Sequence, residues 1–145
     1  MKISTKGRYA LRMLLDLAQN QGDGYVSLKD IAQRQEVSKK YLEQIVPILN
    51  RSGFLKTNRG YQGGYMLAKP PRQYTVGDIL RLTEGDLAPV PCAAQDPADC
   101  PRSEDCATLP VWRGLNRVIN EYLDGITLQD LLDQQRAHYA NDYMI

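Results

Sequence analysis

Three segments of distinct character follow one another in the first half of the chain, and their order is the strongest constraint on its fold. Ser27 precedes a short amphipathic run and Ser38 precedes a longer one, and serine is a preferred N-cap of a helix. Two extended runs, residues 54–58 and 65–68, then flank the glycine-rich segment 59–64, which indicates a β-hairpin. Two helices joined by a brief turn and followed by a hairpin predict a winged helix-turn-helix.

The second half of the chain predicts further helices on either side of an irregular segment. Thr75 caps a short helix that continues to Thr83, and a longer helix with an apolar stripe runs from Pro110 to Gly125. Residues 85–107, between these helices, are rich in proline and contain all three cysteines. We therefore expect a mainly α fold with a small β-hairpin wing and one long helix after the irregular segment.

Charge is distributed unevenly along the chain. Residues 1–72 hold 13 Lys and Arg against 5 Asp and Glu, a net charge of +8, whereas residues 73–145 hold 5 against 12, a net charge of −7. This separation suggests that the first half meets a polyanion, although chance segregation of solvated charge would give the same count.

Other classes of protein fit the sequence less well. No apolar run approaches the roughly 18 residues that cross a bilayer, and the first residues lack the apolar core of a signal peptide, so we expect a cytoplasmic protein. With one histidine, no Cys-x-x-Cys and no phosphate-binding loop, the chain is not expected to be an enzyme. A protein–protein adaptor is the best alternative to a nucleic-acid reader.

The helix that begins after Ser38 carries the side chains best placed to read DNA. Lys39 and Lys40 can contact phosphates or guanine, whereas the same lysines could form no more than a solvated helix face. Gln44 can bond adenine, and Glu43 can accept a hydrogen bond from cytosine. An arginine beside glycines at a hairpin tip can enter a narrow minor groove. The candidate DNA-binding residues are Ser38, Lys39, Lys40, Tyr41, Glu43, Gln44, Arg59, Gly60, Gly63 and Gly64.

The cysteines Cys92, Cys100 and Cys106 form a second candidate site. Their odd number and the expected reducing compartment argue against a structural disulfide framework. Thiolates select iron, zinc and iron–sulfur clusters, and a cluster commonly takes four ligands. Metal binding, a cluster and thiol redox sensing therefore all stay open.

Several motifs resemble those of the Rrf2 family of transcription regulators, and together they span nearly the whole chain. They are ISTKGRYAL (3–11), YLEQI (41–45), RGYQGGY (59–65), VGDI (76–79) and WR (112–113). The resemblance implies a homodimer that binds a palindromic operator in double-stranded DNA and acts as a repressor. It also implies that the helix from Pro110 to Gly125 pairs with its symmetry mate, although its stripe could instead cover the reader domain.

The resemblance gives the expected organisation of the chain. Residues 1–72 form a winged helix-turn-helix DNA-binding domain, and residues 73–107 form a linker helix and a cysteine-containing sensor loop. Residues 108–145 form a dimerisation helix and a C-terminal helix.

Sensor members of the family bind an iron–sulfur cluster in such a loop, which makes the three cysteines candidate ligands. These members complete the site with a histidine three residues after the last cysteine, or with an aspartate near the N-terminus of the partner subunit. This chain has Leu109 and Arg8 at the corresponding positions. The fourth ligand is then an exogenous group or one of three acidic residues, Asp99, Glu104 and Asp105.

Another branch of the family controls cysteine metabolism through a complex with cysteine synthase and without a cluster. The N-terminal run through Tyr9 and the terminal residues 143–145 resemble that branch, whereas the cysteines resemble the cluster-binding members. The alternative function is therefore a cysteine-metabolism regulator with cysteine synthase as its partner.

Overall fold

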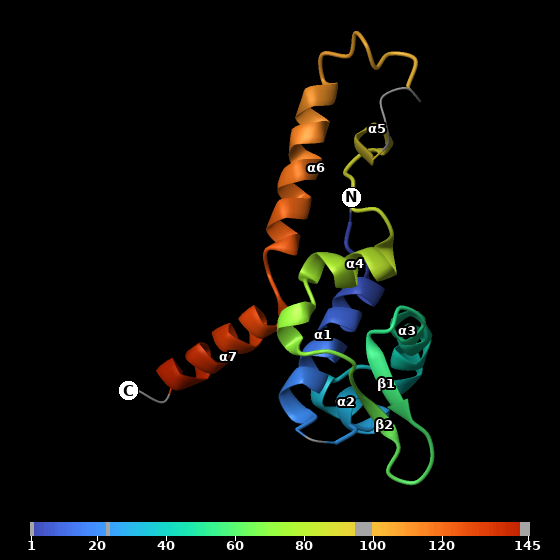
Figure 1. Ribbon diagram of the computed structural model, residues 1–145, viewed down its shortest axis with the longest axis vertical. Coiled ribbons are helices and arrows are strands. Elements are labelled where there is room, and N and C mark those ends of the chain that lie inside the picture. The colour runs from blue at the N-terminus through green and yellow to red at the C-terminus, as the bar shows by residue number, and fades with distance from the viewer. Residues whose placement is uncertain (1, 23, 95–99, 143–145) are drawn as a thin grey trace.

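The computed structural model describes residues 2–22, 24–94 and 100–142, and these residues form a mainly helical fold with one two-stranded antiparallel sheet (Figure 1). The predicted class, mainly α with a β-hairpin wing, is confirmed. Asp99 and the terminal residues 143–145 lie outside the described residues. Within the described residues, no helix has the length and apolar character needed to cross a membrane. In chain order the elements are α1 (Thr5–Asn20), α2 (Leu28–Gln35), α3 (Lys39–Arg51), β1 (Leu55–Asn58), β2 (Gly64–Leu67), the 3₁₀ helix η1 (Pro71–Gln73), α4 (Val76–Glu84), α5 (Pro91–Ala94), α6 (Leu109–Asp124) and α7 (Leu128–Asp142).

Helix α1 runs through the middle of the fold, and α2, α3, β2, α4 and α7 all pack against it. Ala10, Met13, Leu14 and Leu17 recur at helical spacing, so they share one stripe of α1, and all four are buried. Buried partners in the same core come from the surrounding elements: Ile31, Ile45, Leu55, Ile79 and Leu128.

Side-chain caps begin five of the helices, including α7, where the Thr127 hydroxyl accepts the backbone N–H of Asp130 at 3.1 Å. The hydroxyl oxygens of Ser27, Ser38 and Thr75 accept the backbone N–H three residues further on, at 3.1, 3.3 and 3.0 Å, which confirms the three predicted caps. Ser4 caps α1 in the same way, and its backbone N–H also donates to the carboxylate of Glu84 at 3.0 Å. The start of α1 is therefore fixed to the end of α4.

The wing is a short hairpin whose base is held against the start of α2. β1 and β2 pair antiparallel with Leu55 opposite Leu67, and Tyr65 exchanges two backbone hydrogen bonds of 2.8 Å with Val26. Gly64 is buried at this contact, and a Cβ atom there would collide with the backbone of Val26. Only glycine therefore lets the hairpin approach this closely.

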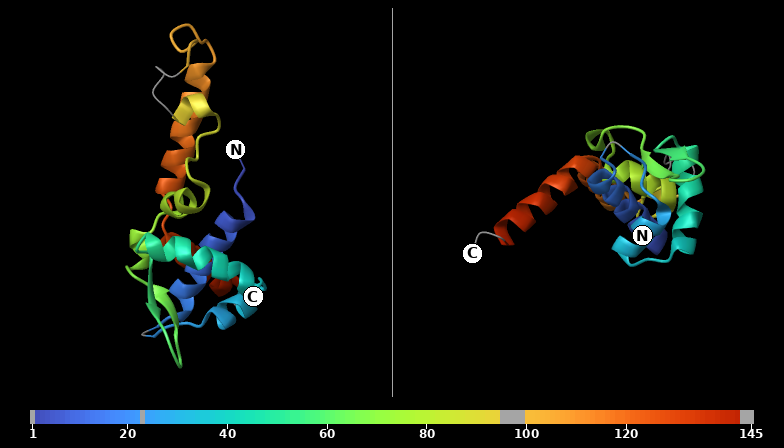
Figure 2. Two further views of the ribbon diagram at one scale, coloured as in Figure 1. Left: turned by 90° about the vertical axis from the view of Figure 1, so that its right-hand side faces the viewer. Right: turned by 90° about the horizontal axis from the view of Figure 1, so that it is seen from below.

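The two candidate sites lie at opposite ends of the molecule. Helix α6 leaves the body at α4 and extends along the long axis, away from the wing (Figure 1). The short helix α5, which forms inside the segment predicted to be irregular, packs on α6. Seen from below, α7 projects from the body on the side opposite α3 (Figure 2).

A buried carboxylate ties α1 to α2. Asp16 has 1% of its side chain exposed and accepts hydrogen bonds from the guanidinium of Arg34, the shortest at 2.7 Å. The side-chain amide of Gln35 donates to the same carboxylate at 2.9 Å. These donors satisfy a charge that would otherwise be costly to bury.

Because Arg34 supplies the positive charge for Asp16, Arg34→Ala should lower the free energy of unfolding by about 1–3 kcal/mol. The lower end of that range applies if water reaches Asp16, since the Arg34 side chain is itself 39% exposed. Urea unfolding followed by circular dichroism measures the change. Arg72→Ala, at an exposed arginine of η1, is the matched control and should leave stability nearly unchanged. Equal stability of the two variants would contradict the role given to Asp16.

Candidate nucleic-acid interface

The first two turns of α3 present polar side chains to solvent. Lys39, Lys40, Glu43 and Gln44 are all exposed, as base-reading residues must be before DNA binds. Lys39 and Glu43 form only a long ion pair of 4.0 Å. An exposed pair of this length contributes little to stability, so both side chains are free to take other partners.

Tyr41 differs from these four exposed residues of α3 because it is half-buried and packs on the core. Its ring meets the ring of Tyr9 in α1 edge-on, with 5.3 Å between centroids. The guanidinium of Arg12 lies 5.4 Å from the Tyr9 centroid and also donates to Gln35. Tyr41 therefore fixes the angle of α3 against α1, and only its exposed part can face DNA.

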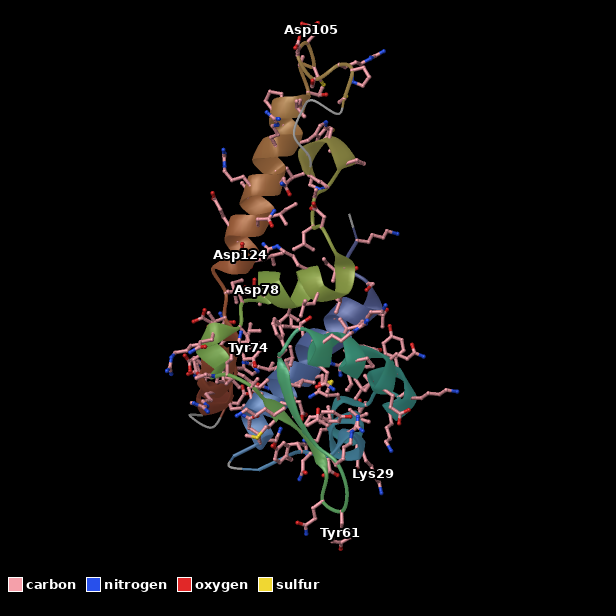
Figure 3. The ribbon with its side chains drawn as sticks, turned by 45° about the vertical axis from the view of Figure 1, so that its right-hand side comes forward. Lys29, Tyr61, Tyr74, Asp78, Asp105 and Asp124 are labelled. Carbon is pink, nitrogen blue, oxygen red and sulfur yellow. The ribbon has the colours of Figure 1, made fainter. Side chains whose placement is uncertain are left out.

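The wing tip contains both exposed and structural residues. Arg59 and Gly60 are exposed, and Tyr61, at the tip, is 97% exposed (Figure 3). Gly60 has φ +112°, a conformation that favours glycine. A Cβ atom on Gly63 would lie 2.8 Å from the carbonyl oxygen of Gly60, so Gly63 serves the tight turn.

A groove of about 640 Å³ separates α3 from the wing. Lys39, Glu43 and Pro47 line one wall, and Arg59 lies on the opposite wall. Lys29, in the first turn of α2, also lines the groove; Figure 3 shows it at the same end of the molecule as Tyr61. The groove therefore brings together positive charge from three elements.

Two residues of this surface were missed by sequence reasoning. Lys29 directly follows the first residue of a helix capped by Ser27, and the start of a helix attracts phosphate groups, to which a neighbouring lysine can also bind. Tyr61 is a large aromatic residue between glycines, which predicts a side chain with nothing to pack against.

The three cysteines lie in the segment between α4 and α6. Cys92 is in α5, Cys106 precedes α6 by three residues, and all three thiols are free and partly exposed. Hydrogen bonding to Thr108, whose hydroxyl lies 3.4 Å from the sulfur, lowers the pKa of Cys106. A thiol with a lowered pKa is more often the reactive thiolate at neutral pH.

The described residues do not form a site for a metal ion or cluster. Across residues 2–22, 24–94 and 100–142, no three Cys, His, Asp or Glu side chains come together to hold one. Leu109 is buried at the start of α6, Arg8 donates to Thr5, and His138 pairs with Asp142 in α7. The donors that the structure describes are therefore not gathered as an iron–sulfur cluster requires.

Comparison with known proteins places this chain and its fold in one family. A model described as the Rrf2 iron-dependent transcriptional regulator matches residues 3–134. The chain belongs to the Rrf2 family. The Rrf2 regulator CymR of Bacillus subtilis is 42% identical to it over 131 residues, covering 90% of this chain and 89% of CymR.

Solved structures of Rrf2 proteins share the fold as well as the sequence. IscR of T. potens superposes with a TM-score of 0.74 at 44% identity, covering 93% of this chain and 88% of that one. CymR of B. subtilis, described as the global cysteine regulator of that organism, gives a TM-score of 0.76 at 40% identity, covering 92% and 98%. The predicted family and winged helix-turn-helix fold are therefore confirmed. This Rrf2 protein is a DNA-binding transcription regulator and not an enzyme.

Proposed function

We propose that the protein is a homodimeric repressor that binds a palindromic operator through α3 and the wing. The observation that carries this proposal is the groove between α3 and the hairpin, with exposed polar side chains on α3 and a basic wing tip beside it. The groove lies between a helix suited to the major groove of DNA and a hairpin suited to the adjacent minor groove. The cytoplasm, where bacterial DNA lies, is then the place of action.

Each part of the surface has a role in this proposal. The N-terminal turn of α3 enters the major groove, where Glu43 and Gln44 meet base edges. The sugar-phosphate backbone follows the groove, where Lys29 and Lys39 neutralise phosphates. Arg59 enters the minor groove from the wing tip.

The second copy is proposed to dock on α6. Val111, Leu115, Val118 and Tyr122 recur at intervals of three and four residues and are exposed, with 56% of Val118 and 67% of Tyr122 accessible. Such a stripe on a protruding helix is unfavourable in water and is the expected seam of a two-fold helix pair. These four side chains point away from the core, which supports pairing with a second copy over the alternative of covering the reader domain, whereas Ile119 and Leu123 of the same helix pack against the cluster that contains Leu80.

For the signal, we propose that the protein reports cysteine or thiol status rather than holding a resident cluster. Two observations support this choice: the described ligands do not gather, and Leu109 and Arg8 occupy the positions of the expected fourth ligands. A complex with cysteine synthase, which the resemblance implies for the cysteine-metabolism branch, requires no cluster.

The DNA-binding proposal predicts that Arg59→Ala weakens operator binding by about 1–3 kcal/mol, roughly 5- to 150-fold, because a minor-groove cation is lost. An operator is first selected from random duplexes, and fluorescence anisotropy then measures its affinity. Arg102→Ala, at an exposed arginine in the cysteine segment, is the matched control and should bind like the parent protein. Unchanged affinity of the Arg59 variant would refute the wing assignment, and weak binding indifferent to sequence would favour an adaptor.

The dimer proposal predicts that Val118→Glu yields a monomer. In a two-fold pair the substitution places two carboxylates at one seam, where each is desolvated beside a like charge. Light scattering after size exclusion measures the mass at micromolar concentration. Arg117→Glu introduces the same side chain outside the stripe and should remain dimeric. A dimeric Val118 variant with native circular dichroism would exclude α6 as the seam.

The proposal on the signal predicts that protein purified without oxygen is colourless and free of iron. Iron and sulfide analysis and an absorption spectrum test it, since clusters give charge-transfer bands between roughly 320 and 450 nm. A brown protein whose bands disappear in Cys92→Ala, Cys100→Ala or Cys106→Ala would instead make the loop a cluster site. That result would leave the DNA-binding proposal intact.

A further inference from the structure

A chain of side-chain hydrogen bonds begins at α5, the helix that carries Cys92. The side-chain amide of Asn116 in α6 donates to the backbone carbonyl of Ala93 at 3.2 Å. The side-chain carbonyl oxygen of Asn116 accepts a hydrogen bond from the side-chain amide of Asn120 at 3.0 Å. Asn120 also donates to the backbone carbonyl of Asn116 at 2.7 Å, which holds the two amides in register.

The chain continues from α6 into α4 through Arg81. The Arg81 guanidinium donates to the side-chain oxygen of Asn120 at 2.7 Å and to the carboxylate of Asp124 at 2.8 Å. It also reaches Asp78 within α4 at 3.5 Å. Figure 3 shows Asp78 and Asp124 close together where α6 meets α4. We call Asn116, Asn120 and Arg81 the amide relay.

Helix α4 is in turn fixed to the elements that hold α3. The Glu84 carboxylate, three residues after Arg81, binds the capping residue Ser4 of α1. Tyr9, five residues after Ser4 in the sequence, packs against Tyr41 of α3. The relay therefore ends in α4, which reaches α3 through α1 and also contacts it directly.

We propose that the amide relay couples the position of α5 to the reader domain, so that a chemical change at Cys92 alters operator affinity. This inference rests on the proposed function, because it requires a defined operator. The contacts are directional: each amide offers one donor group and one acceptor, and moving α5 removes the acceptor that Asn116 uses. A freed amide has to find another partner, which shifts its neighbour in the relay.

The surroundings of the relay leave room for such a shift. A hollow of about 410 Å³ is lined by Arg81, Asn116 and Asn120 together with Ala94 of α5 and Leu87. Side chains beside open space can change rotamer without unpacking a core, whereas tightly packed ones cannot. The hollow gives the relay space for a second arrangement, which coupling between sites requires.

The test uses full-length protein with Cys100→Ser and Cys106→Ser, which leaves Cys92 as its one thiol among the three cysteines of the chain. Operator affinity is measured before and after alkylation of Cys92 with N-ethylmaleimide. With the relay intact, alkylation should change the dissociation constant by about fivefold or more. In Asn116→Ala the change should fall below about twofold, since the contact to α5 is gone.

A conservative variant and a control separate coupling from damage to the fold. Asn120→Asp keeps an oxygen for Arg81 but loses the N–H groups that bind Asn116, so it should also lose the response. Asn141→Ala, at an exposed asparagine near the end of α7, should keep it. A response that persists in both relay variants, or no response with the relay intact, overturns the inference. Failure of the unalkylated protein to bind any selected operator overturns the proposed function instead.

Discussion

Burial of α1 is the constraint on which the rest of the structure depends. Ala10, Met13, Leu14 and Leu17 can leave water only if elements from both halves of the chain pack around them. α2 and α3 come from the reader half, whereas α4 and α7 come from the acidic half. The two halves are opposite in charge but share one core. A disturbance of α4 therefore reaches the elements that carry the candidate DNA surface.

The candidate interface is positioned by groups that do not themselves read DNA. Ser27 and Ser38 begin α2 and α3, Gly64 sets the wing against Val26, and Tyr9 sets the angle of α3. The polar side chains of the surface then need no support from one another. This division explains why the exposed pair of Lys39 and Glu43 can be loose while the backbone beneath it is fixed.

Short-range sequence patterns predicted most of the helices and the hairpin, but few of the contacts between them. The caps and the hairpin followed from single residues, because a serine cap or a glycine turn acts within a few positions of the chain. The close approach of Gly64 to Val26 and the packing of Tyr41 on Tyr9 could not be predicted, since each joins segments far apart in sequence. Helix α5 was missed because four residues between prolines carry no periodic pattern. The links from Asn116 to Arg81 were missed for a related reason: asparagine on a helix gives no indication of its partner.

The attachment of α6 at only one end has a mechanical consequence. Its 16 residues make a rod about 24 Å long, and its base is clamped to α4 by Arg81 and Asp124. A tilt of about 5° at that base displaces the far end by about 2 Å, which is enough to break a hydrogen bond there. Within one copy of the chain, α6 therefore has the geometry of a lever arm. A small rotation at the base of α6 produces a larger displacement near the cysteines. Conversely, a force applied near the cysteines exerts a larger torque on the contact with α4.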